Sequence, residues 1–288
     1  MTVIGTNVAS LRAANASTNA NAALSTAMQR LSTGQRINSA KDDAAGLAIS
    51  DTMTAQIRGM NQGIRNANDG IAMAQTAEGA LGEVSNMLQR VRELTVQATS
   101  GTYSTSDKAN MQAEVSALST QITSTLANTQ FNGNKLFDAS AGTVTAATAA
   151  PAPVAPAYST FKIQAGANAA DSVNVKFNKL TDDTTITNAT SIDLTTATNT
   201  ALATVDSALK TVSTYRAGLG AAQNQLQSAV NNLTTNSTNL TAAKSQITDA
   251  DFSSETTNLA KAQILSQAST AMLAQANQSQ QGVMKLLQ

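Results

Sequence analysis

Seven consecutive heptads in the second half of this chain predict a long helix that packs against other helices. One apolar residue fills the same position in each repeat: Val205, Val212, Leu219, Leu226, Leu233, Leu240 and Ile247. A seven-residue repeat of this kind places one side of a helix against its neighbours. The companion row, three residues earlier, begins with Leu202 and Leu209 and then becomes mixed, with Arg216, Gln223, Val230, Ser237 and Lys244. Such a half-polar row disfavours a two-stranded zipper and predicts a bundle with unequal faces.

The composition excludes several functions. Lys plus Arg and Asp plus Glu each total 18, so the net charge is zero and nucleic-acid binding is not expected. The chain has no His and no Cys, which removes the commonest acid/base group and the commonest metal ligands. We therefore expect no enzyme, no metal and no cofactor.

Targeting signals are also missing from the sequence. No run of 18 apolar residues exists, so we expect no membrane insertion. The amino terminus lacks the apolar stretch of a secretion signal, so any export would need other machinery.

The first half of the chain predicts three helical segments. Residues 1–40 form a weak helix, and a second helix begins near Ala44, bends at Asp69-Gly70 and ends at Ser100-Gly101. Asp107 is expected to cap the third helix at its amino end. Asn132-Gly133 predicts a turn.

The middle of the chain differs in pattern. All three prolines fall within residues 138–157, which predicts a linker or surface loop. Alternating apolar residues at Phe161 and Ile163, and again from Val173 to Phe177, predict a β-hairpin. The Thr-rich residues 181–200 are expected to be weak strand or loop.

Both ends of the chain carry apolar stripes on sparsely charged helices. The amino-terminal stripes and the carboxy-terminal stripe are Ile4, Val8, Leu11, Leu24, Met28, Leu31, Leu265, Met272, Val283 and Leu286. We therefore expect a mainly α fold: a long helical coiled coil or bundle of paired amino- and carboxy-terminal segments, with a small β-hairpin in the middle. The expected domains are a terminal helical domain (1–40 and 253–288), a helical core (41–137 and 200–252) and a linker with the hairpin (138–199).

Several segments resemble bacterial flagellins. Residues 29–50 read QRLSTGQRINSAKDDAAGLAIS, which resembles the family's amino-terminal signature. LQRVRELTVQAT at 88–99, FNGNKLF at 131–137, YRAGLGAAQNQL at 215–226 and the last 28 residues resemble its later segments, in the same order. The resemblance covers about two-thirds of the chain and implies a short flagellin without outer variable domains.

The resemblance implies a function and partners. A flagellin is a structural subunit that polymerises into the extracellular filament used for swimming, after export in an unfolded state by the flagellar secretion system. Its ends are disordered in the monomer and form the inner tube of the polymer. The implied partners are further copies of the chain, an export chaperone on the carboxy-terminal helix, a filament cap protein and hook–filament junction proteins.

One surface patch has two interpretations. Gln89, Arg90, Leu94, Gln97 and Glu114 match the flagellin positions that contact neighbouring subunits and bind a host innate receptor, toll-like receptor five. The alternative is a solvated helix face with ordinary ion pairs.

Two further motifs have structural explanations. The carboxylates of Lys41-Asp42-Asp43 are expected to stabilise the start of the helix near Ala44 rather than to bind a metal. Gly218-x-Gly220 follows no strand, so it is expected to permit close helix packing rather than to bind a dinucleotide.

Three rival functions remain at this stage. A hook–filament junction protein or minor filament component shares the terminal helices, whereas the match at 29–50 and 215–226 favours flagellin. A protease-bearing flagellin needs a histidine-containing zinc motif, and the chain has no His. A trimeric coiled-coil adhesin would need a signal peptide and a membrane anchor.

Overall fold

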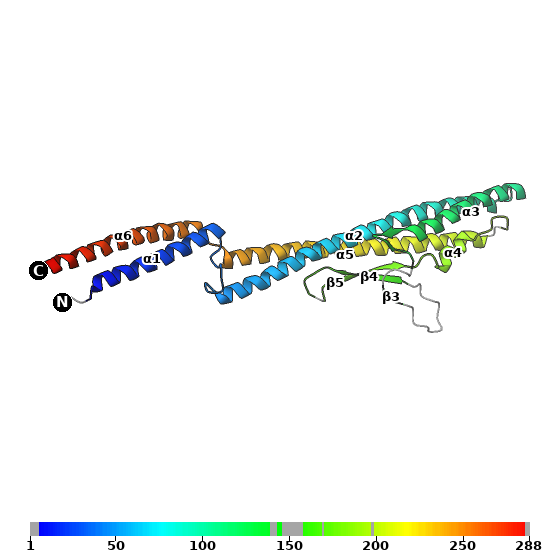
Figure 1. The fold of residues 1–288 in the computed structure, drawn as a ribbon. Helices are drawn as coiled ribbons and strands as arrows, with labels where there is room; N and C mark the ends of the chain where they lie inside the picture. Colours follow the sequence, from blue (N-terminus) through cyan, green and yellow to red (C-terminus); the bar gives the residue numbers. More distant parts are fainter. Residues whose placement is uncertain (1–5, 139–142, 146–157, 169, 197–198, 286–288) are drawn as a thin grey trace. The chain divides into compact units, whose positions relative to one another are not determined.

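The computed structural model describes residues 6–138, 143–145, 158–168, 170–196 and 199–285, and these are mainly helical (Figure 1). The helices are α1 (Val8–Thr33), α2 (Ala44–Thr99), α3 (Thr105–Asn128), α4 (Thr184–Thr190), α5 (Asn199–Thr248) and α6 (Phe252–Lys285). The strands are β1 (Gln130–Phe131), β2 (Asn134–Lys135), β3 (Thr143–Thr145), β4 (Tyr158–Gln164) and β5 (Ser172–Asn178). The predicted mainly α fold with a small β region in the middle is confirmed.

The chain divides into two compact units, residues 1–56 with 238–288 and residues 57–237. The unit boundaries fall inside α2 and α5. The predicted domain boundaries fall instead in the helix break that follows α1, at 40/41, and one residue inside the start of α6, at 252/253. The first unit therefore contains parts of α2 and α5 that the sequence analysis assigned to the helical core.

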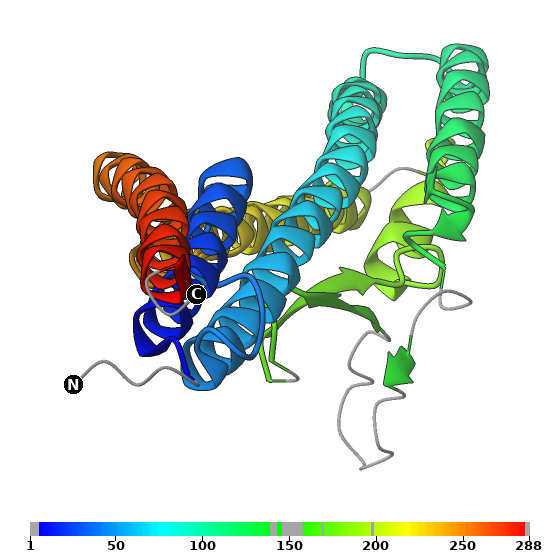
Figure 2. The same cartoon turned by 60° about the vertical axis from the view of Figure 1, so that its left-hand side comes forward.

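In the first unit, α1 and α6 lie side by side and run antiparallel (Figure 2). The two segments that break the helices are joined to each other. Ala250 N donates to Gly34 O (3.0 Å), and Arg36 N donates to Thr248 O (2.7 Å). Gly34 has φ +71°, the left-handed conformation that ends helices and favours glycine.

In the second unit, the apolar faces of α2, α3 and α5 share one core with the sheet. The buried residues at its centre come from all of these elements: Leu81, Leu88, Ile122, Leu126, Phe137, Phe177, Val212, Leu219 and Leu226. The polar companion positions of α5 have a partner on α2, because Gln223 Nε2 donates to Glu78 Oε2 (2.8 Å) and Arg216 lies 3.9 Å from the same carboxylate. The predicted half-polar face of α5 is therefore paired, at these two positions, with a carboxylate on α2.

The predicted hairpin is present and is part of a three-stranded antiparallel sheet in the order β3-β4-β5. Phe161 pairs with Val175 and Ile163 with Val173. Phe161 and Phe177 also meet edge to face, with ring centroids 5.4 Å apart. Val175 and Phe177 are buried, so this face of the sheet covers the helical core.

The capping residue of α3 differs from the prediction. The N-cap is Ser104, whose hydroxyl accepts from Asp107 N (3.2 Å), while the Asp107 carboxylate accepts from Ser104 N (3.0 Å). Asp107 is therefore the third residue of a capping box rather than the cap. The hydrogen bond from the Ser104 hydroxyl, followed by that from the Ser104 backbone, lowers the pKa of Asp107.

Residues 181–200 were expected to be weak strand or loop, and this was wrong for residues 184–190. Asp183 caps a short helix, α4, by accepting from Thr185 N (2.8 Å). Its other carboxylate oxygen accepts from the Tyr215 hydroxyl of α5 (3.0 Å). Ile186 and Ala189 of α4 are buried, so tertiary packing outweighs the low helix propensity of threonine.

Before α2, Asp43 contacts the start of the helix as predicted, whereas Asp42 binds the preceding loop instead. Asp43 Oδ1 accepts from Gly46 N (2.9 Å), and Asp42 Oδ2 accepts from Asn38 N (3.1 Å) and Ser39 N (2.9 Å). Hydrogen bonds lower the pKa of Asp42, first from the Ser39 hydroxyl and then from the backbones of Asn38 and Ser39.

The helix α2 continues through Gly70, a buried residue at which a Cβ would lie 3.1 Å from Ile163 and 3.2 Å from Leu226. A different expectation about glycine was wrong. Gly218 and Gly220 have open space where a Cβ would lie, so they do not mediate close packing. A close approach is instead made at Gly63 of α2, where a Cβ would lie 2.8 Å from the backbone of Ala165 in the β4–β5 turn.

These contacts predict opposite effects for two glycine substitutions in α2. Gly63→Ala should lower the free energy of unfolding by about 1–2 kcal/mol, because the added methyl group collides with the turn. Gly82→Ala is the matched control, since its Cβ would meet no atom within 4 Å. It should raise stability by up to about 1 kcal/mol through helix propensity. Chemical denaturation followed by circular dichroism measures both, and an equal stabilisation by both would contradict the close approach.

Candidate assembly surfaces

The seam between α1 and α6 is built from small side chains. Ala13, Ala20 and Ala27 are buried along α1, and Ala262 and Ser269 are buried along α6. Burial stabilises in proportion to apolar area, at about 25 cal/mol per Å². Alanine and serine contribute little such area, so this seam supplies a thin apolar interface for two helices of 26 and 34 residues.

Large apolar side chains of the same two helices are exposed. The exposed fractions are 63% for Leu11, 56% for Met28, 48% for Leu265 and 63% for Met272. Val8, also predicted as a stripe residue, is exposed, as are Phe252 and Ile264, which the sequence analysis missed. Apolar side chains gathered on a surface mark a site of interaction.

The other predicted stripe residues have different positions. Leu24 and Leu31 are half-buried. Val283 belongs to α6, but its side chain lies outside the described residues, as do Ile4 and Leu286. The predicted apolar stripes of α1 and α6 thus contain some residues that the chain itself partly buries and others that are exposed.

Polar contacts fix α1 against α6 along its length. Asn7 Nδ2 donates to Ala276 O (3.1 Å), and Ser266 Oγ donates to Asn21 Oδ1 (2.8 Å). These residues are half or fully exposed, so water competes for the same hydrogen bonds.

The heptad residues of α5 differ in burial along the helix. Val205, Val212, Leu219 and Leu226 are at most 4% exposed. Leu233, Leu240 and Ile247 are half-buried. The first four pack against α2, α3 and the sheet, whereas the later positions retain open apolar surface.

The patch on α2 and α3 is organised by Arg90. Its Nε donates to Glu114 Oε1 (2.8 Å), and its Nη1 donates to Glu93 Oε2 (2.9 Å). Hydrogen bonding to Glu114 and then Glu93 raises the pKa of Arg90. The predicted residues Arg90 and Glu114, 24 positions apart, are therefore in direct contact.

The remaining patch residues are divided between surface and interior. Gln89 and Gln97 are exposed, but Leu94 is 2% exposed and packs inside the second unit, so it offers no surface. Sequence reasoning missed Glu93, although its spacing of three from Arg90 on a helix was a usable signal. It also missed the pair of Arg92 Nε and Asp206 Oδ1 (2.6 Å), because no local spacing links residues on different helices.

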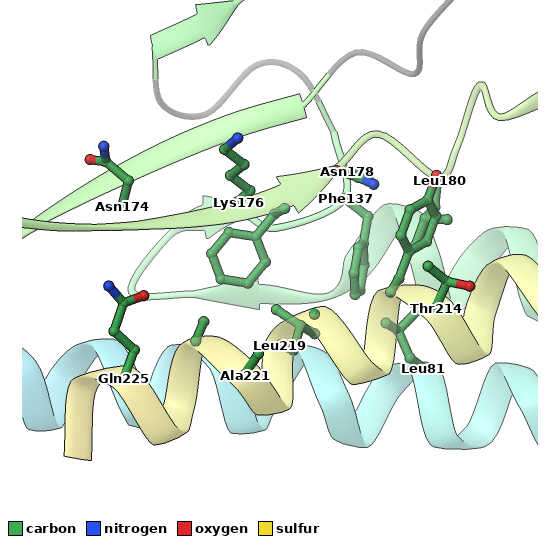
Figure 3. Close-up of a pocket in the computed structure, with 14 residues that line it drawn as sticks. Leu81, Phe137, Asn174, Lys176, Asn178, Leu180, Thr214, Leu219, Ala221 and Gln225 are labelled. Carbon is green, nitrogen blue, oxygen red and sulfur yellow. The ribbon is translucent and has the colours of Figure 1, made fainter. Parts of the chain in front are cut away.

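A cavity of about 310 Å³ lies between β5 and α5 (Figure 3). Phe177, Leu180, Tyr215 and Leu219 give it apolar walls. Polar side chains of Asn174, Lys176 and Gln225 also line it. Burial raises the pKa of Tyr215, whose hydroxyl donates to Asp183. The cavity therefore presents apolar surface and a hydroxyl already in use, with no arrangement of reactive groups.

Metal-binding clusters and membrane-spanning helices are both missing from the part of the chain that the structure describes. The described residues contain no cluster of three or more His, Cys, Asp or Glu that could hold a metal ion. None of the helices in the described ranges combines the length and apolar character needed to cross a membrane.

These features define a helical protein whose paired terminal helices offer apolar surface to partners. Comparison with known families gives two matches. The model of the bacterial flagellin N-terminal helical region matches residues 4–142, and that of the C-terminal helical region matches residues 202–287.

Individual relatives match over nearly the whole chain. The flagellin of Bacillus subtilis (strain 168) is 43% identical over 99% of both chains. The flagellin of Halalkalibacterium halodurans is 42% identical over 91% of this chain and 90% of its own. The crystal structure of Bacillus cereus flagellin is 28% identical, covers 62% of this chain and 94% of that chain, and has a TM-score of 0.47. The chain belongs to the bacterial flagellin family.

The unequal burial of the α5 heptads predicts unequal costs of truncation. Leu226→Ala should lower the free energy of unfolding by about 2–5 kcal/mol, because the side chain is fully buried. Leu233→Ala, seven residues further on and half-buried, should cost clearly less. Denaturant unfolding of the monomer measures both, and equal losses would contradict the burial described here.

Proposed function

We infer that this chain is a structural subunit that polymerises into the bacterial flagellar filament. Its membership of the flagellin family over both terminal regions supports this function. The observation that carries it is the exposed apolar surface of α1 and α6, which includes Leu11, Met28 and Met272. A polymer of identical subunits can cover this surface on every copy.

We propose that assembly is coupled to the folding of residues 1–40 and 253–288. Ordering a residue costs about 1–2 kcal/mol in backbone entropy. Fully burying a leucine or methionine side chain gains about 1.5–3 kcal/mol. Because the seam within one chain buries mainly alanine and serine, the larger gain comes only when neighbouring copies cover Leu11, Leu265 and Met272.

The terminal helices provide the direct test of this proposal. The full chain should form long helical filaments after seeding or salting-out, and a chain trimmed to residues 41–252 should not, as judged by electron microscopy. A full-length Leu11→Gln/Met272→Gln variant is the matched variant, because both side chains are exposed in the isolated chain. It should keep the helix content of the monomer and assemble poorly.

Two outcomes would contradict the account. Filaments from the trimmed chain would show that the terminal helices are dispensable. Soluble particles from the full chain would favour a hook–filament junction protein or a minor filament component.

Other partners follow from the same proposal. An export chaperone would bind the carboxy-terminal helix α6, where Ile264, Leu265 and Met272 are exposed and available. The filament is extracellular, so the chain would leave the cell through the flagellar secretion system. A filament cap protein and hook–filament junction proteins would then contact it at the two ends of the polymer.

We also propose that the patch around Arg90 binds toll-like receptor five of a host. Arg90, Gln89, Gln97 and Glu114 form an exposed polar surface that spans α2 and α3. Leu94 contributes only by supporting this surface from inside. The alternative, ordinary ion pairs on a solvated helix face, predicts no receptor signalling.

Substitution of Arg90 distinguishes the two interpretations. Arg90→Ala monomer should activate receptor-expressing reporter cells less than the native chain, because Glu93 and Glu114 lose the cation between them. Arg65→Ala is the control, since Arg65 is also exposed on α2 but bonds only to Gln62 among the contacts described. Unchanged signalling by Arg90→Ala would contradict the receptor proposal.

A further inference from the structure

The α1–α6 seam repeats itself every seven residues on both helices. Ala13, Ala20 and Ala27 are seven apart on α1. Ala262, Ser269 and Ala276 are seven apart on α6. If α6 moved along α1 by one heptad, small side chains would again face small side chains. The shape of this part of the seam therefore does not specify how far α6 extends along α1.

One residue of the α6 row breaks the repeat. Glu255 lies seven residues before Ala262 and is 8% exposed, although it carries a carboxylate. Its Oε2 lies 4.0 Å from Arg30 Nη1 on α1. The Arg30 Nε is itself buried and has no hydrogen-bond partner among the described residues. Arg12 and Lys261, by contrast, are exposed.

We propose that the Arg30–Glu255 pair sets the axial register of α1 on α6 when the terminal helices assemble. A shift of one heptad would move Glu255 to the level of Ala23, or beyond the end of α1 at Thr33. In the first case the carboxylate would face α1 without its cation, which is unfavourable, and in the second case Arg30 would lose its carboxylate. A single polar or charged residue in a heptad core specifies register in the same way. The proposal deepens the polymerisation function and depends on it.

A second contact also restrains the register of α1 on α6, at the same end of the two helices as Arg30 and Glu255. The segments that break the helices are joined by backbone hydrogen bonds, and Arg36 Nη2 donates to Ile247 O (2.7 Å). Gln35 and Arg36 are exposed, so water competes for these bonds. The Arg30 and Glu255 side chains are 29% and 10% exposed, so water has less access to this pair, and the test separates the two restraints.

Cysteine cross-linking reads the register directly, because the chain has no cysteine of its own. Asn21→Cys with Ser266→Cys reports the native register, since these side chains are 2.8 Å apart. Ala14→Cys or Met28→Cys, each with Ser266→Cys, reports a shift of one heptad in either direction. Each pair is oxidised in assembled filaments. Non-reducing gels then exclude links between chains, and peptide mapping identifies the link within the chain.

The cysteine pairs are compared in three versions of the Arg30–Glu255 pair. With Arg30 and Glu255 intact, the native pair should cross-link and the shifted pairs should not. In Arg30→Leu/Glu255→Leu, filaments should still form, because replacing a buried ion pair with apolar residues is tolerated, and shifted links should rise about tenfold. In the charge swap Arg30→Glu/Glu255→Arg, the native link should again predominate. Arg36→Ala is the control for the second restraint and should keep the native link.

The outcomes are distinguishable. Native links alone in the double-leucine background would overturn the proposal and assign the register to the helix-break contacts. If that background does not assemble, the charge swap decides: restored native links support the proposal, and their absence overturns it. Failure of the unsubstituted chain to form filaments would instead contradict the proposed function.

Discussion

The interaction on which this protein depends is the thin seam between α1 and α6. Its buried positions hold alanine, serine and Glu255, while Leu11, Met28, Phe252, Ile264, Leu265 and Met272 of the same helices are exposed. A pair of helices arranged in this way leaves large apolar side chains open to partners. This arrangement supports the proposal that contacts with other copies stabilise the terminal helices as the subunit polymerises.

The second unit has the opposite arrangement. Fully buried leucine, valine and phenylalanine side chains from α2, α3, α5 and the sheet share its core. Glycine at Gly63 and Gly70 lets the hairpin approach α2, and Glu78 pairs with two of the polar companion positions of α5, Arg216 and Gln223. This unit buries its large side chains within one copy. The first unit, by contrast, exposes large apolar side chains on α1 and α6.

The sequence predicted the features that follow from periodicity. The heptads of α5, the stripes of α2 and the alternation of β4 and β5 are long repeats, and the mainly α fold follows from them. Errors arose where local propensity and tertiary packing disagree. Asp107 has the right chemistry for a cap, but Ser104 occupies that position, and α4 is a threonine-rich helix stabilised by the burial of Ile186 and Ala189. The ion pair of Arg92 with Asp206 joins positions 114 residues apart, which no local pattern reveals.

Hydrogen–deuterium exchange of the same protein as monomer and as filament tests the central claim most directly. Amide exchange in α1 and α6 reports how often the terminal helices open, and exchange in buried parts of α2 and α5 provides an internal reference. The account predicts rapid exchange of α1 and α6 in the monomer, strong protection in the filament, and little change in the segments around Leu81 and Leu219. Equal protection of the terminal helices in both states would show that one chain stabilises them alone, and would contradict the account.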